Sequence, residues 1–128
     1  RRTPALAAKF AAEFNTPFVS REFFTQQRER VGAACEAINR DPNDLVYSAA
    51  LIVCCGANEA EVAQRAASIG REPSELRENG LAGTPGEVAE RIRSWRDAGA
   101  ERIYLQMMDL DDLDHLNLIA NDVATQLV

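Results

Sequence analysis

The only histidine of the chain stands in an acidic run, DLDDLDH, over Asp109–His115. Clustered carboxylates suit a hard cation such as Ca²⁺, and an imidazole suits a general base. A calcium-binding EF-hand loop, however, needs glycine at its sixth position and glutamate at its twelfth, where this chain has Asp114 and Ala120. The run opens a predicted helix, so its carboxylates are expected to offset the helix dipole, and no metal site is predicted. His115 has no partner motif and is expected on the surface or on a helix face.

A second candidate is the amino end, where Arg1, Arg2 and Thr3 precede Pro4. Threonine followed by proline is typical of a helix start, because the hydroxyl caps the first turn and proline has no N–H that needs a partner. The first turn of a helix has free N–H groups and a positive partial charge, which suit an anion. These three residues are therefore candidate anion contacts; the alternative is a solvated chain end.

The three cysteines are not spaced like a metal or redox motif. Cys54 and Cys55 are adjacent in an apolar stretch, and neighbouring residues of a strand point to opposite faces. They cannot readily chelate one ion, and the sequence has no CxxC. Together with Cys35 they are predicted to be small core residues, and the lack of a disulfide framework indicates a reducing, cytoplasmic compartment.

The elements that position these residues alternate between strand and helix. Apolar runs predict strands over 13–19, 45–55 and 101–108, and helical periodicity with capping residues predicts helices over about 3–14, 20–38, 58–69, 73–79, 84–98 and 111–127. The run 45–55 is apolar on both faces, which is typical of a covered parallel strand. We therefore expect an α/β fold with a parallel sheet and flanking helices, one domain or part of one. Three strands are few for such a sheet, so its edges are expected to be open.

Composition limits the classes of function. The 128 residues carry a formal net charge of -6 and are 46% hydrophobic, the balance of a globular domain. The acidic balance, with no basic cluster larger than a pair, argues against a nucleic-acid partner. No apolar run approaches the roughly 20 residues that span a bilayer, so no membrane association is predicted. The start at Arg1 is expected to be a cut or a processed end.

Three passages, in order, resemble one known family: RRTPALAAKFAAEFN (1–15), NRDPNDLVYSAALIVCCGANEAE (39–61) and GTPGEVAERIRSWRDAGAERIYLQMMDLDDLDHL (83–116). Together they look like the C-terminal end of the bacterial luciferase-like monooxygenase superfamily, closest to the branch that uses coenzyme F-420, a deazaflavin. The resemblance rests on the order of the passages rather than on any single motif.

The resemblance implies that residues 1–128 are the C-terminal portion of a TIM barrel, a (β/α)8 fold. The first helix would follow strand five, and strands six, seven and eight would lie near Phe14–Phe18, Leu45–Cys55 and Arg102–Met107. Strands one to four, which carry most cofactor contacts in that family, would be absent. Three of eight strands cannot close a barrel, so this chain is expected to be inactive alone.

The resemblance also assigns roles to particular residues. Arg1, Arg2 and Thr3 would contact the phosphate tail of the cofactor, which would be coenzyme F-420 or, as the alternative, FMN. Asn15 and Gln106 would line the substrate pocket, because the active site of a TIM barrel lies at the carboxyl ends of its strands. The alternatives are a turn residue before Pro17 for Asn15 and a hydrogen-bonding rim residue for Gln106. No catalytic residue is assigned.

Two hypotheses of function follow. The first is an oxidoreductase or monooxygenase of the luciferase-like type, dependent on F-420 or FMN, that acts on a small molecule by hydride transfer or flavin monooxygenation. The second is a non-enzymatic α/β association module, or a degenerate remnant, that pairs with itself as a homodimer or with a complementary half-barrel. The open edges of a three-stranded sheet motivate the second hypothesis.

Overall fold

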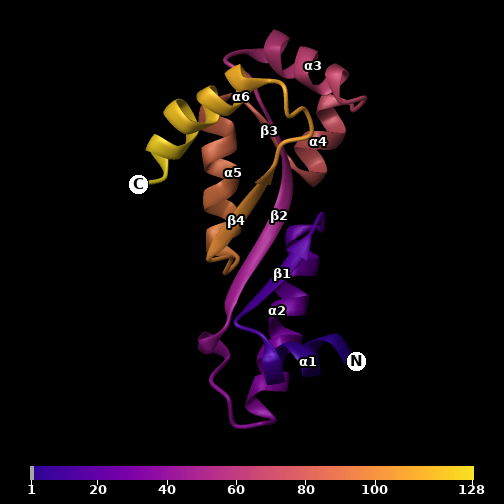
Figure 1. Cartoon of the computed structure of the whole chain (residues 1–128), viewed down its shortest axis with the longest axis vertical. Helices are drawn as coiled ribbons and strands as arrows, with labels where there is room; N and C mark the ends of the chain where they lie inside the picture. The colour runs from indigo at the N-terminus through magenta and orange to yellow at the C-terminus, as the bar shows by residue number, and fades with distance from the viewer. Residues whose placement is uncertain (1) are drawn as a thin grey trace.

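The computed structural model describes residues 2–128, and its centre is one long strand. Within these residues the sheet has four strands: β1 (Glu13–Pro17), β2 (Val46–Cys55), β3 (Leu81–Gly83) and β4 (Arg102–Gln106). Strands β1, β3 and β4 all run parallel to β2 and pair with it (Figure 1). The expected α/β fold with a parallel sheet is therefore confirmed.

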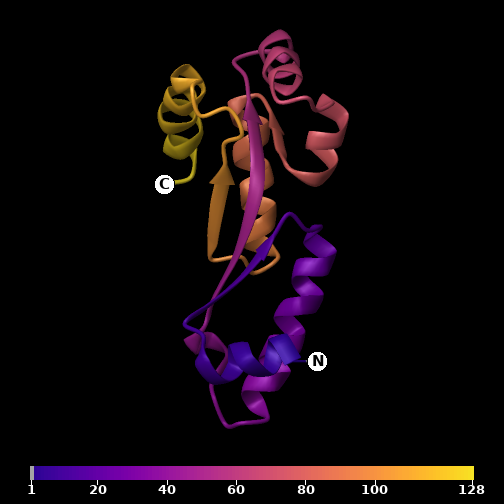
Figure 2. The same cartoon turned by 45° about the vertical axis from the view of Figure 1, so that its right-hand side comes forward.

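Register places the shorter strands at different heights along β2. Asn15 of β1 and Arg102 of β4 both lie opposite Ser48, in the first half of β2. Strand β3 pairs only with the last three residues of β2, where Leu81 lies opposite Val53. The carboxyl ends of β2 and β4 point to the same end of the molecule, the top of the view in Figures 1 and 2.

The helices connect the strands and carry their expected capping residues. They are α1 (Arg2–Phe10), α2 (Arg21–Glu36), α3 (Glu59–Ser68), α4 (Pro73–Asn79), α5 (Pro85–Asp97) and α6 (Leu113–Leu118). The Ser20 hydroxyl accepts from the Phe23 N–H at the start of α2, and Asn58 accepts from the Glu61 N–H at the start of α3. Such caps satisfy N–H groups that have no partner inside the helix.

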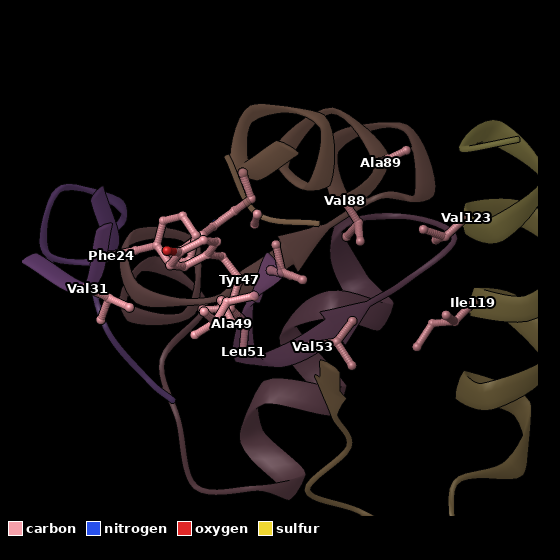
Figure 3. Close-up of a cluster of buried hydrophobic side chains, with 14 of the residues drawn as sticks. Phe24, Val31, Tyr47, Ala49, Leu51, Val53, Val88, Ala89, Ile119 and Val123 are labelled. Carbon is pink, nitrogen blue, oxygen red and sulfur yellow. The ribbon is translucent and has the colours of Figure 1, made fainter. Parts of the chain in front are cut away.

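One face of the sheet packs against helices to form the main core. Alternate residues of β2, from Tyr47 to Val53, meet side chains of α2, α5 and the C-terminal helix, drawn in Figure 3 and including Phe24, Val31, Val88, Ala89, Ile119 and Val123. The Phe24 and Trp95 rings meet edge to face, with centroids 5.6 Å apart, and join α2 to α5. A smaller cluster around Cys54 and Val62 packs α3 and α4 against the end of β2.

The structure differs most from the prediction at the first helix, at β3 and at the last helix. The first helix ends at Phe10 rather than near Phe14, and β3 was not predicted because three residues, LAG, carry no periodicity. The last helix begins at Leu113 and passes at Ile119 into a π-helical turn over Ile119–Val123 and a 3₁₀ turn over Ala124–Gln126. Over residues 2–128 the helices are too short or too polar to cross a bilayer.

Candidate functional site

The face of the sheet away from the main core carries six polar side chains, which we call the polar face: Glu13, Asn15, Ser48, Arg102, Tyr104 and Gln106. Alternation along each strand sends these residues to one side. Ser48 is fully buried, whereas Tyr104 is 40% exposed. The polar face therefore grades from a buried centre on β2 to a partly solvated edge on β4.

Glu13 is the acceptor at the centre of this network. Ser48 Oγ donates to its Oε1 at 2.6 Å, and Arg102 donates to its Oε2 at 2.6 Å. Tyr104 Oη also donates to Oε2, at 3.3 Å. The hydrogen bond from Ser48, supported by those from Tyr104 and Arg102, holds the pKa of Glu13 below its usual value. A carboxylate held this way is a structural anchor, because its oxygens are occupied and it resists protonation.

The two predicted pocket residues both lie on the polar face but are not neighbours. Asn15 lies in the middle of β1 rather than at its end, and its Nδ2 donates to Ser48 Oγ at 2.9 Å. Gln106 is the last residue of β4, opposite Ile52. Ser48 and Ile52 are four positions apart on β2, so Asn15 and Gln106 are separated by roughly 13 Å along the strand direction. Gln106 lies at the carboxyl end, where the active site was predicted.

The predicted anion contacts lie elsewhere. Arg2 and Thr3 are exposed at the start of α1, which packs against α2. Figures 1 and 2 both draw α1 at the opposite end of the molecule from the carboxyl ends of β2 and β4. Arg1 lies outside the described residues. The described part of the chain does not bring Arg2 or Thr3 together with Gln106, and their role as cofactor contacts stays a prediction.

Side chains from α3 and the start of α6 meet at the end of β2, in an arrangement that sequence reasoning missed. We call it the carboxyl-end cluster: Cys55, Glu61, Arg65, Asp112 and His115. Arg65 Nε donates to Asp112 Oδ2 at 2.8 Å, and its Nη1 donates to Glu61 at 3.1 Å and to the Cys55 carbonyl at 2.9 Å. The Cys55 N–H donates to His115 Nε2 at 2.9 Å.

His115 lies on the inward face of α6 and is 5% exposed, so of its two expected places the helix face is confirmed and the surface is wrong. Burial, together with the positive charge of Arg65, lowers the pKa of His115. The next residue of α6, Leu116, is instead 50% exposed. A signal for the buried position was present in the sequence, because His115, Ile119 and Val123 recur every four residues along one helix face.

Two carboxylates of the acidic run bind backbone N–H groups: Asp112 caps α6, and Asp109 holds the turn before it. Asp112 Oδ1 accepts from the His115 N–H at 2.8 Å, and Asp109 accepts from the Asp111 N–H at 3.1 Å. The hydrogen bond from Arg65 holds the pKa of Asp112 below its usual value. Among residues 2–128, no three His, Cys, Asp or Glu side chains are grouped so that they could hold a metal ion. A surface groove of about 650 Å³ is lined by three residues of the cluster, Glu61, Arg65 and Asp112, together with Asp109, Asp114 and neutral side chains.

The cysteines are core residues, as predicted. Cys35, Cys54 and Cys55 are free thiols, each at most 1% exposed. Burial raises the pKa of Cys55 to about 11 and also raises that of Cys54. A thiol with a raised pKa is a poor nucleophile at neutral pH, so neither group is a candidate catalytic residue.

Comparison with known proteins identifies the fold. No family model and no curated protein matches the sequence. Among solved structures, an F420-dependent secondary alcohol dehydrogenase superposes with a TM-score of 0.77 at 11% identity, over 99% of this chain and 46% of the other. The F420-dependent tetrahydromethanopterin reductase of Methanopyrus kandleri gives 0.76 at 11% identity, over 99% and 48%. The EDTA monooxygenase of Chelativorans sp. BNC1 gives 0.74 at 19% identity, over 97% and 43%.

Two of these solved structures are F420-dependent enzymes and the third is a monooxygenase, which are the kinds of enzyme that the resemblance in the sequence implies. The predicted resemblance is therefore confirmed, at the level of the fold. The chain spans less than half the length of each of these three proteins.

Proposed function

We propose that this chain is the C-terminal portion of a luciferase-like barrel and contributes to an oxidoreductase that uses coenzyme F-420, with FMN as the alternative cofactor. The observation that carries the proposal is the superposition on an F420-dependent dehydrogenase over 99% of this chain but only 46% of that protein. In this assignment β1, β2 and β4 are strands six, seven and eight, and β3 belongs to the connection after strand seven. The compartment would be the cytoplasm.

The polar face would then line the inside of the barrel. In a closed barrel alternate residues of each strand point inward, and the site lies at the carboxyl ends. Gln106, at the carboxyl end of β4, fits a contact to substrate or cofactor. Asn15, held by Ser48, fits a lower layer of the interior. Glu13 and Arg102 lie at the first residues of their strands, at the end of a barrel that contributes stability.

A deazaflavin or flavin would supply the redox chemistry by accepting or delivering a hydride, and the protein would orient it and the small-molecule substrate. Arg2 and Thr3, exposed in the first turn of α1, would contact the anionic tail of such a cofactor, which would have to reach from the carboxyl ends of the strands toward the other end of the molecule (Figure 1). Arg1 would join them. Gln106 would supply a neutral amide, which can donate to or accept from a ring or substrate oxygen.

The proposal requires the rest of the barrel for activity. Among the described residues, β1 and β4 each pair with β2 alone, so each has an edge without a partner strand. Such a sheet leaves the β4 side of the polar face partly open to water, where hydrogen bonds to a ligand are weakened by competition. The chain alone is therefore expected to bind neither cofactor tightly.

A hybrid protein tests the proposal. Residues 1–128 would be joined behind the N-terminal half of an F420-dependent enzyme of this fold, and binding of F-420 and FMN would be measured by fluorescence. We expect F-420 binding, weakened about ten-fold or more by Gln106→Ala. The matched control is Gln26→Ala, on the exposed face of α2, which should leave binding unchanged. A folded hybrid that binds FMN but not F-420 would show that the alternative cofactor is the right one. A folded hybrid that binds neither cofactor would refute the proposal.

A second candidate function is an association module, and one observation favours it. Beside the open edge of β4 lies a groove of about 260 Å³ with apolar lining from Ile92, Ile103, Leu105 and Leu127. An unpaired strand edge next to apolar surface favours association with another chain. The partner would be a second copy of this chain or a complementary half-barrel, without any catalytic role.

A further inference from the structure

Both backbone hydrogen-bonding groups of Cys55, the last residue of β2, are held by side chains. Its N–H donates to His115 Nε2 at 2.9 Å, and its carbonyl accepts from Arg65 Nη1 at 2.9 Å. These are 60 and 10 residues away in the sequence. Side chains of two helices, α6 and α3, thereby supply the hydrogen-bond partners of the last residue of β2.

The two side chains are also tied to each other through Asp112. Its Oδ2 accepts from Arg65 Nε at 2.8 Å, while its Oδ1 accepts from the backbone N–H of His115 at 2.8 Å. All three are largely buried: the side chains of Arg65 and Asp112 are 17% and 22% exposed, and His115 is 5% exposed. Hydrogen bonds to charged groups are stronger than neutral ones, especially away from water.

This unit, Arg65, Asp112 and His115, which we call the clasp, secures one end of segment 107–112. The other end of the segment leaves β4 directly after Gln106. Between the two ends, Met108 is 53% exposed and Leu110 is 81% exposed, so the middle of the segment has little packing of its own. The position of the segment therefore depends on β4 at one end and on the clasp at the other.

We infer that His115 and Arg65 are positioning residues: they hold segment 107–112 at the carboxyl edge of the sheet by locking α6 onto Cys55. The segment then forms a fixed wall beside Gln106. Its use as a wall of a cofactor or substrate site rests on the proposed function, whereas the locking itself does not.

The bond to Cys55 dictates one tautomer of His115. A ring nitrogen that accepts a hydrogen bond from an N–H group carries no proton. Nε2 is therefore unprotonated, and the proton of the neutral ring is on Nδ1. Leucine has a similar apolar volume but no acceptor, whereas glutamine offers a side-chain carbonyl that can accept from the Cys55 N–H. These two replacements separate packing at position 115 from the hydrogen bond.

Amide-resolved hydrogen exchange on the whole chain tests the clasp. For His115→Leu we expect exchange of the Cys55 amide and of the amides of 107–112 to quicken at least ten-fold, with 46–50 of β2 unchanged. His115→Gln should restore most of the protection. Arg65→Leu should act like His115→Leu, while the matched control Arg71→Leu, which breaks an exposed pair with Glu75 on the next turn, should not.

Either of two results would overturn the inference: an unchanged Cys55 amide in His115→Leu, or an equal loss of protection everywhere, which would give His115 only a general role in stability. If the leucine variant does not fold, ¹⁵N spectra of the wild-type imidazole decide, because a proton on Nε2 at neutral pH contradicts the clasp. The proposed function is tested separately: an intact clasp in a hybrid that binds no cofactor would refute that proposal and leave this one standing.

Discussion

At Ser48 a single hydroxyl joins two strands on the polar face. It donates to Glu13 at 2.6 Å and accepts from Asn15 at 2.9 Å, so its donor and an acceptor position are both used. Ser48 is 0% exposed, so its hydroxyl loses its hydrogen bonds to water on folding. The bonds to Glu13 and Asn15 take their place. The polar face thus belongs to the folded structure, whichever ligand it meets.

Ser48→Ala should lower the free energy of unfolding by about 1–2 kcal/mol, because it leaves the Asn15 amide without its buried partner. Urea denaturation followed by circular dichroism measures the change. Ser68→Ala is the control: this exposed hydroxyl bonds only to the carbonyl one helical turn before it, and the change should stay within about 0.5 kcal/mol. If both variants lost the same free energy of unfolding, the hydrogen bonds of Ser48 would contribute no more to stability than an exposed hydrogen bond.

His115 should make stability depend on pH. Burial lowers the pKa of His115 in the folded state from its usual value of 6.5. Just below pH 6.5 the imidazole is therefore protonated more readily in the unfolded chain than in the folded chain. The contribution of the neutral ring is therefore complete above about pH 6.5 and is lost as the pH falls, by at most about 1.4 kcal/mol per pH unit.

Urea midpoints between pH 8 and about pH 5 check this dependence, because His115 is the only histidine. The His115→Gln variant should show a flatter profile in that window, since glutamine does not titrate. Carboxylates with lowered pKa values, such as Asp112 and Glu87, lose their contributions at lower pH. Parallel profiles for the two proteins would contradict the prediction.

At the scale of elements, α3 approaches the end of β2 closely at Gly56. A Cβ at this position would lie 2.5 Å from the Val62 backbone nitrogen and 2.9 Å from the Glu61 Cβ. Such distances are shorter than any van der Waals contact, so only glycine permits this approach. The strand–helix junction that brings Arg65 to Cys55 depends on it.

Gly56→Ala should therefore destabilise the protein by about 1–3 kcal/mol through overpacking, measured as a shift of the urea midpoint. Gly86→Ala is the matched control in the first turn of α5, where a Cβ meets nothing within 4 Å. Alanine there should be neutral or stabilising by up to about 1 kcal/mol, because it favours the helix. A stable Gly56→Ala variant would mean that α3 can shift away from β2.

At the scale of the whole molecule, β2 is covered on both faces, whereas β1 and β4 each have an edge without a partner strand among residues 2–128. Tyr104, on the partly solvated side of β4, is 40% exposed. Strands of a parallel sheet are usually covered on both faces, so the open edges and the partly solvated side of β4 favour addition of further structure there.

We expect the isolated chain to self-associate with rising concentration, as sedimentation velocity would detect. Tyr104→Lys should weaken this association, because a lysine on an open sheet face opposes strand addition and can still pair with Glu13. Phe10→Lys, on α1 away from the sheet edge and 71% exposed in its native form, is the control and should have little effect. A monomer at every concentration would argue against the association module.

Local patterns in the sequence determined most of the elements. Ser20, Asn58 and Thr84 marked three helix starts, and the apolar run of β2 identified a covered parallel strand, because capping and periodicity act over a few residues. The family resemblance added the barrel class, which the shared fold supports. Such features need no knowledge of what lies across the molecule.

Only the tertiary structure decided which polar groups meet. Strand register brings Glu13 to Arg102 across 89 residues, and helix packing brings His115 to Cys55 across 60. Neither pairing leaves a spacing signal, since partners distant in sequence are chosen by the geometry of the whole sheet. The family resemblance predicted Asn15 and Gln106 for one substrate pocket at the strand ends, but the fold determined that Asn15 is held inside the polar network while Gln106 lies at the carboxyl end of β4.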